Sequence, residues 1–198
     1  MEASTTTAAA IVAGGRARRF GGQDKSRLVV EGRTIIVRQL EVLQQVADPV
    51  FVVGPDPARY ADLGLTVHPD AVPDAGALGG IYTALLHATT DRVLVVACDL
   101  PFLHAGLLTR LIERSEAGDA AWARSDIQAQ PLLACYRRDA HARIRSQIDA
   151  GHLRATDLAH TLDIVEIGPD EIVTYGPPER LLANLNTPAD YARVQYGG

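Results

Sequence analysis

Short apolar runs alternate with amphipathic stretches along most of the chain. Residues 8–13 and 93–98 are almost continuously apolar, which is typical of strands that are covered on both faces of a sheet. Within residues 81–88 the apolar positions instead recur at i, i+3, i+4 and i+7, which predicts an amphipathic helix. The same two patterns predict further strands at residues 50–53, 65–67, 120–123, 132–136 and 164–167, and further helices through 34–46, 107–112, 144–148 and 189–195.

The order of these segments predicts the fold class. Alternation of strands and helices implies an α/β fold, in which right-handed crossovers connect the strands of an open, mostly parallel sheet. A length of 198 residues fits one domain of this kind. We therefore expect a single doubly wound, Rossmann-like domain over residues 8–198, with helices flanking a central sheet, and a flexible N-terminal tail over residues 1–7.

Composition narrows the class of protein. The chain is 47% hydrophobic and 22% charged, and no apolar run approaches the roughly 18 residues of a membrane span, so we expect a globular protein outside the membrane. The N-terminus has no basic region before an apolar stretch, which argues against a secretory signal. Cys98 and Cys135 form no C-x-x-C pair, which argues against a zinc site and is expected in the reducing cytoplasm.

Charge is distributed unevenly along the chain. The net charge of −5 argues against a nucleic-acid-binding surface. Residues 16–27 nevertheless carry a net charge of +4, which leaves −9 for the rest of the chain. This segment contains Lys25, the only lysine among 19 basic residues, and a lysine presents a more compact charge than an arginine. The segment is therefore a candidate site for an anionic ligand, with a chance occurrence of the lysine as the alternative.

Ligands bind at the carboxyl ends of the strands in doubly wound sheets, and the first loop at this edge follows residues 8–13. Gly14 and Gly15 allow close approach to a ligand, while Arg19 and Lys25 supply positive charge, so the loop has the composition of a phosphate cradle. It is not a Walker loop, because an aspartate precedes the lysine, and it lacks the third glycine of the dinucleotide fingerprint. The alternative is a solvated glycine-rich loop.

The second loop connects residues 65–67 to the helix through 81–88. Asp70 in this loop is a candidate acceptor of a hydrogen bond from a ribose or a metal-bound water, and a turn-forming aspartate is an equal alternative. Gly79 and Gly80 lie in the first helical turn, where each is about 1 kcal/mol less favourable than alanine. This suggests that a base or ribose packs closely against that backbone.

The third loop begins at Asp99, directly after the apolar run 93–98. A carboxylate at the end of a central strand can hold Mg²⁺, which then bridges phosphate oxygens. A turn-forming aspartate ahead of Pro101 is the alternative. A haloacid dehalogenase site is excluded, because it requires a second aspartate where Pro101 stands.

These loops, together with two later motifs, resemble the molybdenum cofactor guanylyltransferase family of bacterial nucleotidyltransferases. The resemblance covers almost the whole chain in the family's order. It is carried by Ala13-Gly14-Gly15, Arg19-Phe20-Gly21, Asp24-Lys25, Gly76-Ala77-Leu78-Gly79-Gly80, Cys98-Asp99-Leu100-Pro101-Phe102, Gln130-Pro131-Leu132 before Tyr136-Arg137, and Asn184-Leu185-Asn186-Thr187-Pro188.

The resemblance implies an activity and a role for each motif. The activity is transfer of GMP from Mg²⁺-bound GTP to the terminal phosphate of molybdopterin, with release of pyrophosphate. Transient contact with molybdoenzymes or cofactor-insertion proteins is implied in the same way. By this analogy the nucleotide contacts Val12, Ala13, Gly14, Gly15, Asp70, Gly79 and Gly80, its phosphates contact Lys25 and Arg19, the metal binds Asp99, and the acceptor contacts Asn184 and Asn186.

Three positions depart from the family's pattern. Phe20 replaces a common methionine, which is a tolerable apolar exchange. Ala77 stands where a proline is usual, which is expected to loosen the second loop. Gly54 stands about where many members carry a nucleotide-contacting asparagine, so that contact is missing or made differently.

Two other functions stay open. One is a cytidylyltransferase or sugar-phosphate nucleotidyltransferase of the same fold, against which the Gly14-Gly15 and Asp24-Lys25 pairs favour the guanylyl branch. The other is a non-catalytic GTP-binding module, against which the presence of both Lys25 and Asp99 argues.

Overall fold

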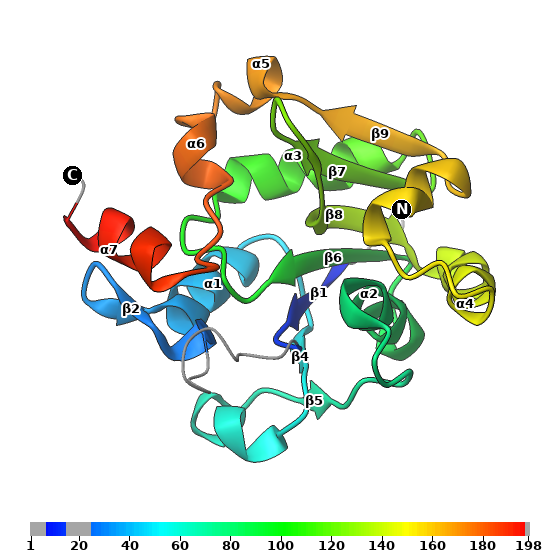
Figure 1. The fold of residues 1–198 in the computed structure, drawn as a ribbon, viewed down its shortest axis with the longest axis horizontal. Helices are drawn as coiled ribbons and strands as arrows, with labels where there is room; N and C mark the ends of the chain where they lie inside the picture. The colour runs from blue at the N-terminus through cyan, green and yellow to red at the C-terminus, as the bar shows by residue number, and fades with distance from the viewer. Residues whose placement is uncertain (1–6, 15–24, 197–198) are drawn as a thin grey trace, which may run out of the picture.

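The central sheet is built from the apolar runs of the sequence (Figure 1). The computed structural model describes residues 7–14 and 25–196. Within these residues, seven strands form one sheet in the order β5-β4-β1-β6-β8-β7-β9. The innermost pair, β1 and β6, is almost completely buried, as expected of continuous apolar runs. In spatial order the strands are β5 (Val67–His68), β4 (Val50–Val53), β1 (Thr7–Val12), β6 (Arg92–Ala97), β8 (Ala129–Arg137), β7 (Ala120–Arg124) and β9 (Ile164–Ile167).

All strand pairings in this sheet are parallel except those of β8. This strand runs antiparallel to both β6 and β7. The reason lies in the connection, since residues 125–128 form a short turn between β7 and β8, and only antiparallel neighbours can be joined by such a turn. The Ser125 N–H donates to the Gln128 carbonyl at 2.9 Å to close it. The prediction of a mostly parallel sheet is confirmed, and the reversal of β8 is an addition to it.

Helices cover both faces of the sheet, as predicted. Alternate residues of β1 belong to two different cores, because successive side chains of a strand point to opposite faces. One face packs against α2 and α4, and the other packs against α1 and α3. These four helices are α1 (Ile35–Leu43), α2 (Gly76–His87), α3 (Ala105–Ser115) and α4 (His141–Asp149).

A third and smaller core holds the C-terminal part of the chain against the loop after β6. Its buried members are Val30, Ile35, Phe102 and Leu185. The remaining elements are the hairpin of β2 (Val29–Val30) and β3 (Arg33–Thr34), the short helices α5 (Pro169–Ile172) and α6 (Pro178–Leu181), α7 (Pro188–Tyr196), and the 3-10 helices η2 (Lys25–Arg27), η3 (Pro57–Leu63), η4 (Arg138–Ala140) and η5 (Ala155–His160).

Several predicted element boundaries differ from the structure, among them those of the first strand and of the second helix. Thr7 is the first residue of β1 and is buried, although the sequence assigned it to the N-terminal tail. The helix predicted through residues 81–88 begins earlier, at Gly76. The last helix is capped, since Thr187 and Asp190 exchange hydrogen bonds between side chain and backbone at 3.2 and 2.9 Å.

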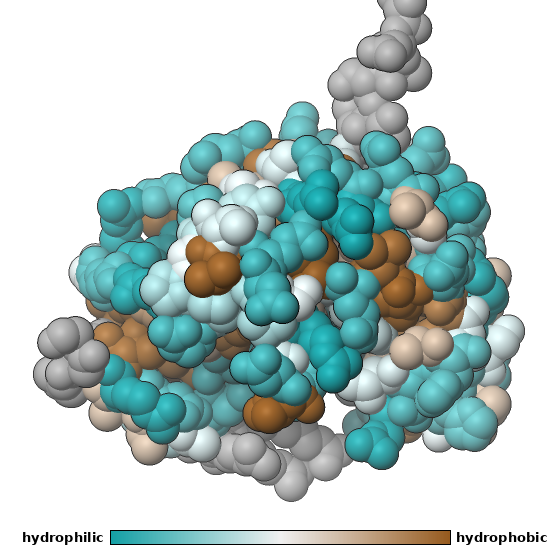
Figure 2. Space-filling model, turned by 90° about the horizontal axis from the view of Figure 1, so that it is seen from above, coloured by the Kyte–Doolittle hydropathy of each residue, from teal (hydrophilic) through white to brown (hydrophobic). Residues whose placement is uncertain are grey.

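The surface is mixed in character. Figure 2 shows one face of the molecule, on which hydrophobic side chains form separate patches among hydrophilic ones. Among the described residues, no helix combines the length and the hydrophobicity that crossing a bilayer requires.

Candidate active site

The strand order reverses between β1 and β6, and open α/β sheets bind their ligands at such a point. From β1 the chain passes to β4 and β5 on one side, and then crosses through α2 to β6 on the other side. The carboxyl ends of β5, β4, β1 and β6 therefore lie along one edge of the sheet, which we call the carboxyl edge. All three loops that the sequence singled out begin at this edge.

Lys25, Asp99 and Asn186 meet at the carboxyl edge. The Lys25 Nζ donates to Asp99 Oδ2 at 2.9 Å and to Asn186 Oδ1 at 2.9 Å. The Lys25 and Asp99 side chains are only 20% and 14% exposed, so this ion pair is partly shielded from water. Three loops that are far apart in the sequence thus contribute one charged group, one counter-charge and one amide.

The lysine is positioned by its two neighbours in η2. The buried Ser26 hydroxyl lies 3.2 Å from the hydroxyl of Tyr60, which is 1% exposed in η3. The Arg27 guanidinium donates to both carboxylate oxygens of Asp62 at 2.9 and 2.6 Å, which is the two-point geometry that arginine favours. Sequence reasoning did not identify these contacts, because η3 carries no periodic pattern that marks Tyr60 as a partner of η2.

The carboxylate of Asp99 is positioned by a buried glutamine. Gln39 Nε2 donates to the carbonyls of Ala97 and Leu100 at 2.8 and 2.9 Å, on both sides of Asp99 in the sequence. Its side chain bridges the turn after β6 and so fixes the direction in which β6 ends. A usable signal was present, since Gln39 is a polar residue on the apolar face of the predicted helix 34–46.

The two candidate acceptor residues differ in what they contact. The Leu185 N–H, which lies between them, donates to the Asp99 carbonyl at 3.0 Å. Asn186 turns its amide toward Lys25, whereas Asn184 Nδ2 donates to the nearby Leu182 carbonyl at 3.2 Å. Of the two, only Asn186 contacts the lysine, and it does so through its carbonyl oxygen.

Asp70 lies at the same edge and is not satisfied by the protein. Its Oδ1 is buried and has no hydrogen-bond partner. Burial raises the pKa of this carboxyl above its usual range, because the charged form loses contact with water. Its Oδ2 lies 3.2 Å from the position that a Cβ on Gly14 would occupy. A glycine at position 14 therefore leaves the space between this carboxylate and the end of β1 open to a ligand.

Val12, Gly79 and Gly80 have packing contacts that the sequence did not predict. A Cβ on Gly80 would lie 2.5 Å from Val12 Cγ1, and a Cβ on Gly79 would lie 2.9 Å from that of Ala75. Gly80 thus lets α2 pack closely against β1, whereas Gly79 leaves room for Ala75 and for the Val72 carbonyl at the start of α2. The Val12 carbonyl also accepts from the Cys98 N–H at 3.1 Å, so Val12 supports the edge.

Ala13 and Gly14 are the described residues of the first loop that lie beyond β1. Ala13 is partly exposed and Gly14 is exposed, and the Ala13 N–H donates to Val53 at 2.8 Å. The Ala13 Cβ lies 3.5 Å from the position of a Cβ on Gly54, so a side chain at position 54 would contact the end of β1. Ala77 is exposed in the first turn of α2, so its departure falls in a helix and not in a loop.

Three further candidates lie outside the described residues. They are Gly15, Arg19 and Phe20. Their roles stay as the sequence predicts them.

Comparison with known proteins identifies the family. The family of MobA-like NTP transferase domains matches residues 9–165. The chain belongs to this family. The resemblance inferred from the motifs is thereby confirmed.

Named relatives of this MobA-like chain agree with the family. A protein of Chloroflexus aggregans named "Probable molybdenum cofactor guanylyltransferase" is 39% identical over 93% of this chain and 91% of its own length. A protein of Syntrophotalea carbinolica named "Molybdenum cofactor guanylyltransferase" is 30% identical over 96% and 91%. The crystal structure of molybdopterin-guanine dinucleotide biosynthesis protein A from Archaeoglobus fulgidus has a TM-score of 0.80 at 25% identity, over 95% of this chain and 96% of the other.

The carboxyl edge of this MobA-like chain offers a donor set that fits Mg²⁺. Among the described residues no group of three or more histidine, cysteine, aspartate or glutamate side chains forms a complete metal cage. Mg²⁺ is commonly held by one or two carboxylates together with the phosphates of the substrate, and it keeps several waters. Asp99, partly exposed and at the end of β6, supplies a carboxylate of the required kind.

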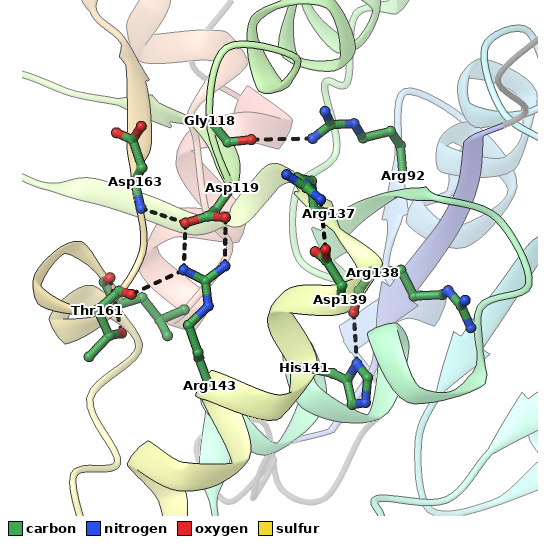
Figure 3. A network of polar contacts seen from close by, with 11 residues as sticks. Arg92, Gly118, Asp119, Arg137, Arg138, Asp139, His141, Arg143, Thr161 and Asp163 are labelled. Atoms are coloured by element: carbon green, nitrogen blue, oxygen red, sulfur yellow. Dashed lines mark hydrogen bonds and ion pairs between the residues drawn. The ribbon is translucent and has the colours of Figure 1, made fainter.

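A hollow lies at the end of the sheet opposite the carboxyl edge. It has a volume of about 390 Å³ and is lined by Asp91, Arg92, Arg137, Arg138 and Asp139. Arg137 pairs with Asp139 at 2.6 Å, and Arg92 approaches the Gly118 carbonyl at 3.5 Å (Figure 3). Because its acidic and basic side chains nearly balance, this hollow has no strong preference for an anion.

Proposed function

We propose that this chain transfers GMP from Mg²⁺-bound GTP to the terminal phosphate of molybdopterin and releases pyrophosphate. The observation that carries the proposal is the 2.9 Å contact between the Lys25 amine and the Asp99 carboxylate at the carboxyl edge of a MobA-like domain. This contact places a cation for phosphates beside a carboxylate for a metal. Transfer of a nucleotidyl group depends on such a pair.

The reaction needs no side chain that removes a proton. An anionic oxygen of the acceptor's terminal phosphate forms a bond to the α-phosphorus of GTP. The bond from that phosphorus to the oxygen that bridges to the β-phosphate breaks, and pyrophosphate leaves with its electron pair. The protein therefore acts by holding the two phosphates in line and by placing positive charge where negative charge grows.

Each described residue of the edge has a part in this proposal. Lys25 neutralises charge on the α-phosphate and on the leaving pyrophosphate. Asp99 would hold Mg²⁺, which would supply further positive charge at the phosphates. Asp70 accepts a hydrogen bond from the nucleotide, because its buried oxygen lacks a protein donor. Ala13 and Gly14 lie against the base.

The remaining assignments rest on the family alone. Arg19 and Gly15 contact the triphosphate, and Asn184 and Asn186 contact molybdopterin. The fold by itself does not select the nucleotide, since a structure of CMP:2-keto-3-deoxy-manno-octonic acid synthetase has the same fold at 13% identity with a TM-score of 0.68.

The proposal is tested by measuring pyrophosphate release from the purified chain with Mg²⁺ and molybdopterin. GTP, CTP, ATP and UTP are compared one at a time, and each reaction is repeated without molybdopterin. We expect release with GTP that depends on both the metal and the acceptor. Selectivity for CTP would instead identify a cytidylyltransferase, and GTP binding without release would identify a binding module.

The setting of the reaction follows from the same proposal. We place the chain in the cytoplasm, with GTP and molybdopterin as its ligands and with no nucleic acid among its partners, as its net charge of −5 supports. Transfer of the product to molybdoenzymes or cofactor-insertion proteins requires only transient contact. Co-purification of the chain with such proteins under mild crosslinking tests this part.

A further inference from the structure

The Lys25 amine is already engaged by the protein at two points. Asp99 Oδ2 and Asn186 Oδ1 both lie 2.9 Å from its Nζ. An ammonium group has three hydrogens to donate and accepts none. Under the proposed function the same amine has to contact both the α-phosphate and the leaving pyrophosphate, which takes two of its three hydrogens, so it has to give up a bond to the protein when the nucleotide binds.

The bond to Asn186 is the weaker of the two. Asp99 carries a full negative charge and its side chain is 14% exposed, so its bond to the ammonium joins two ions with little water between them. Asn186 is neutral and exposed, so water competes for its amide. Asn186 is therefore the partner that yields.

The backbone around Asn186 can stay in place while its side chain turns. The preceding residue, Leu185, is 1% exposed and is bonded through its N–H to the Asp99 carbonyl at 3.0 Å. The Asn186 N–H itself donates to Asp190 Oδ2 at 3.2 Å. These contacts hold the main chain on both sides of the amide, so only side-chain rotation is required.

We propose that Asn186 is an exchange partner of the lysine amine: it holds Lys25 when the nucleotide is absent, and it turns to the phosphate-bearing acceptor when Lys25 moves to the triphosphate. This inference rests on the proposed function. Nucleotide binding then completes the acceptor site, so GTP binds before the acceptor. Because coupling between two ligands is reciprocal, the bound acceptor in turn tightens GTP.

The effect of the Asn186 hydrogen bond on the reactivity of the Lys25 amine, which we call the hold on Lys25, can be measured without any substrate, because Lys25 is the only lysine of the chain. The folded protein is reductively methylated with formaldehyde and cyanoborohydride for increasing times. Peptide mass spectrometry separates methylation at Lys25 from methylation at the N-terminal amine. We expect Asn186→Ala to be labelled at Lys25 about three- to tenfold faster than the wild type, which is the range for losing one hydrogen bond. Equal labelling rates would overturn the hold.

Calorimetric titration with Mg²⁺-GTP then measures the exchange. Asn186→Ala is expected to bind GTP about three- to tenfold more tightly, because the competing acceptor is gone. Asn186→Asp is expected to bind GTP more weakly, because a carboxylate holds the ammonium more strongly. Ala189→Asp, which adds the same charge at an exposed neighbouring position, controls for simple repulsion. Its GTP affinity should fall less than that of Asn186→Asp.

A purely structural role predicts a different result. If Asn186 only stabilised the fold, both substitutions would weaken GTP binding. If it only contacted the acceptor, Asn186→Ala would raise the KM for molybdopterin and leave GTP affinity unchanged. The exchange predicts a raised KM for molybdopterin together with tighter GTP binding, and either of the other two results would overturn it. A wild-type chain that binds no GTP would overturn the proposed function, whereas the labelling rates test the hold separately.

Discussion

The two ends of the central sheet treat charge in opposite ways. At the amino ends of β7 and β9, Asp119 accepts two hydrogen bonds from Arg143 at 2.5 and 2.7 Å and one from the Asp163 N–H at 2.9 Å (Figure 3). Those bonds hold the pKa of the Asp119 carboxyl below its usual range. At the carboxyl edge, Asp70 keeps a buried oxygen without a partner, and its pKa is raised.

The difference separates structural charges from functional ones. At the amino end, the Asp119 and Asp139 carboxylates already have arginine donors. The carboxyl edge keeps a carboxylate that the protein does not satisfy and an amine whose partners are exchangeable, so its polar groups are in place for something that binds. The hollow of about 390 Å³ at the amino end lies beside the Arg137–Asp139 ion pair.

The largest contrast between the two ends should appear in activity. Replacing one preorganised charged group at a reacting centre lowers the rate by about 10²–10³. We expect losses of this size in kcat for Lys25→Ala and Asp99→Ala, with thermal unfolding close to that of the wild type. Pyrophosphate release and differential scanning fluorimetry provide the two measurements.

The matched control for these variants is Arg138→Ala, which removes an exposed cation from the amino end. It should leave kcat within about twofold, since exposed charges at that distance are screened. Near-normal turnover of Lys25→Ala or Asp99→Ala would contradict the role assigned to that residue.

Gly80→Ala tests how far the carboxyl edge depends on packing beneath it. The added methyl group would lie 2.5 Å from Val12 Cγ1, so α2 or the end of β1 must shift. Overpacking of this kind lowers the free energy of unfolding by about 1–3 kcal/mol, and the better helix propensity of alanine offsets part of that. Urea unfolding measures the loss.

The same variant should also bind GTP more weakly, because Ala13 and Gly14 follow directly after Val12. Leu86→Ala on the exposed side of α2 serves as the comparison and should unfold within about 0.5 kcal/mol of the wild type. A Gly80→Ala protein that kept full stability would show that α2 can move freely against β1.

Asp119→Asn tests the amino end. We expect a loss of about 1 kcal/mol at neutral pH and unchanged turnover, because Arg143 is partly exposed and water screens the pair. The pKa of the Asp119 carboxyl is lower in the folded state than in the unfolded state. The stabilisation from this carboxylate is therefore complete above the unfolded-state pKa, and it is lost as the pH falls through the folded-state pKa. Denaturation curves of wild type and variant should therefore begin to converge at about pH 4 and coincide only below the lowered pKa of the folded state.

Asp70→Asn should have the smallest effect on stability and the opposite sign. A carboxyl whose pKa is raised in the folded state destabilises the fold when it is ionised. Replacing it should therefore raise the free energy of unfolding at neutral pH. The expected gain is only about 0.5 kcal/mol, because water still screens part of the charge. The gain should disappear as the pH falls through the raised pKa. GTP affinity should fall, and a variant that gained stability without losing affinity would remove Asp70 from the site.

Much of the fold could be predicted from the hydrophobic pattern, because β1 and β6 are continuous apolar runs and α1 buries residues at helical spacing. The orientation of β8 could not, since residues 132–136 read as a strand in either direction and only the four-residue turn before them decides it. Lys25 and Asp99 were found through their chemical types and their places after strands.

The contacts that position those side chains were harder to predict. Gly79 and Gly80 illustrate the limit, because a glycine shows that something lies close without showing whether it is a ligand or another part of the protein. The interaction of Asn186 with Lys25 connects positions 161 residues apart, and no local pattern records a contact of that kind.

The order of the strands also bears on how the molecule assembles. β7 and β8 are neighbours along the chain, whereas β1 must find β6 across the span from Thr7 to Arg92. Contacts between distant segments form more slowly than local ones, because a longer loop must close first. Trp122, the only tryptophan, lies in β7. During refolding from urea its fluorescence should therefore recover before nucleotide binding does, which would make the ligand a reporter of the last step of folding.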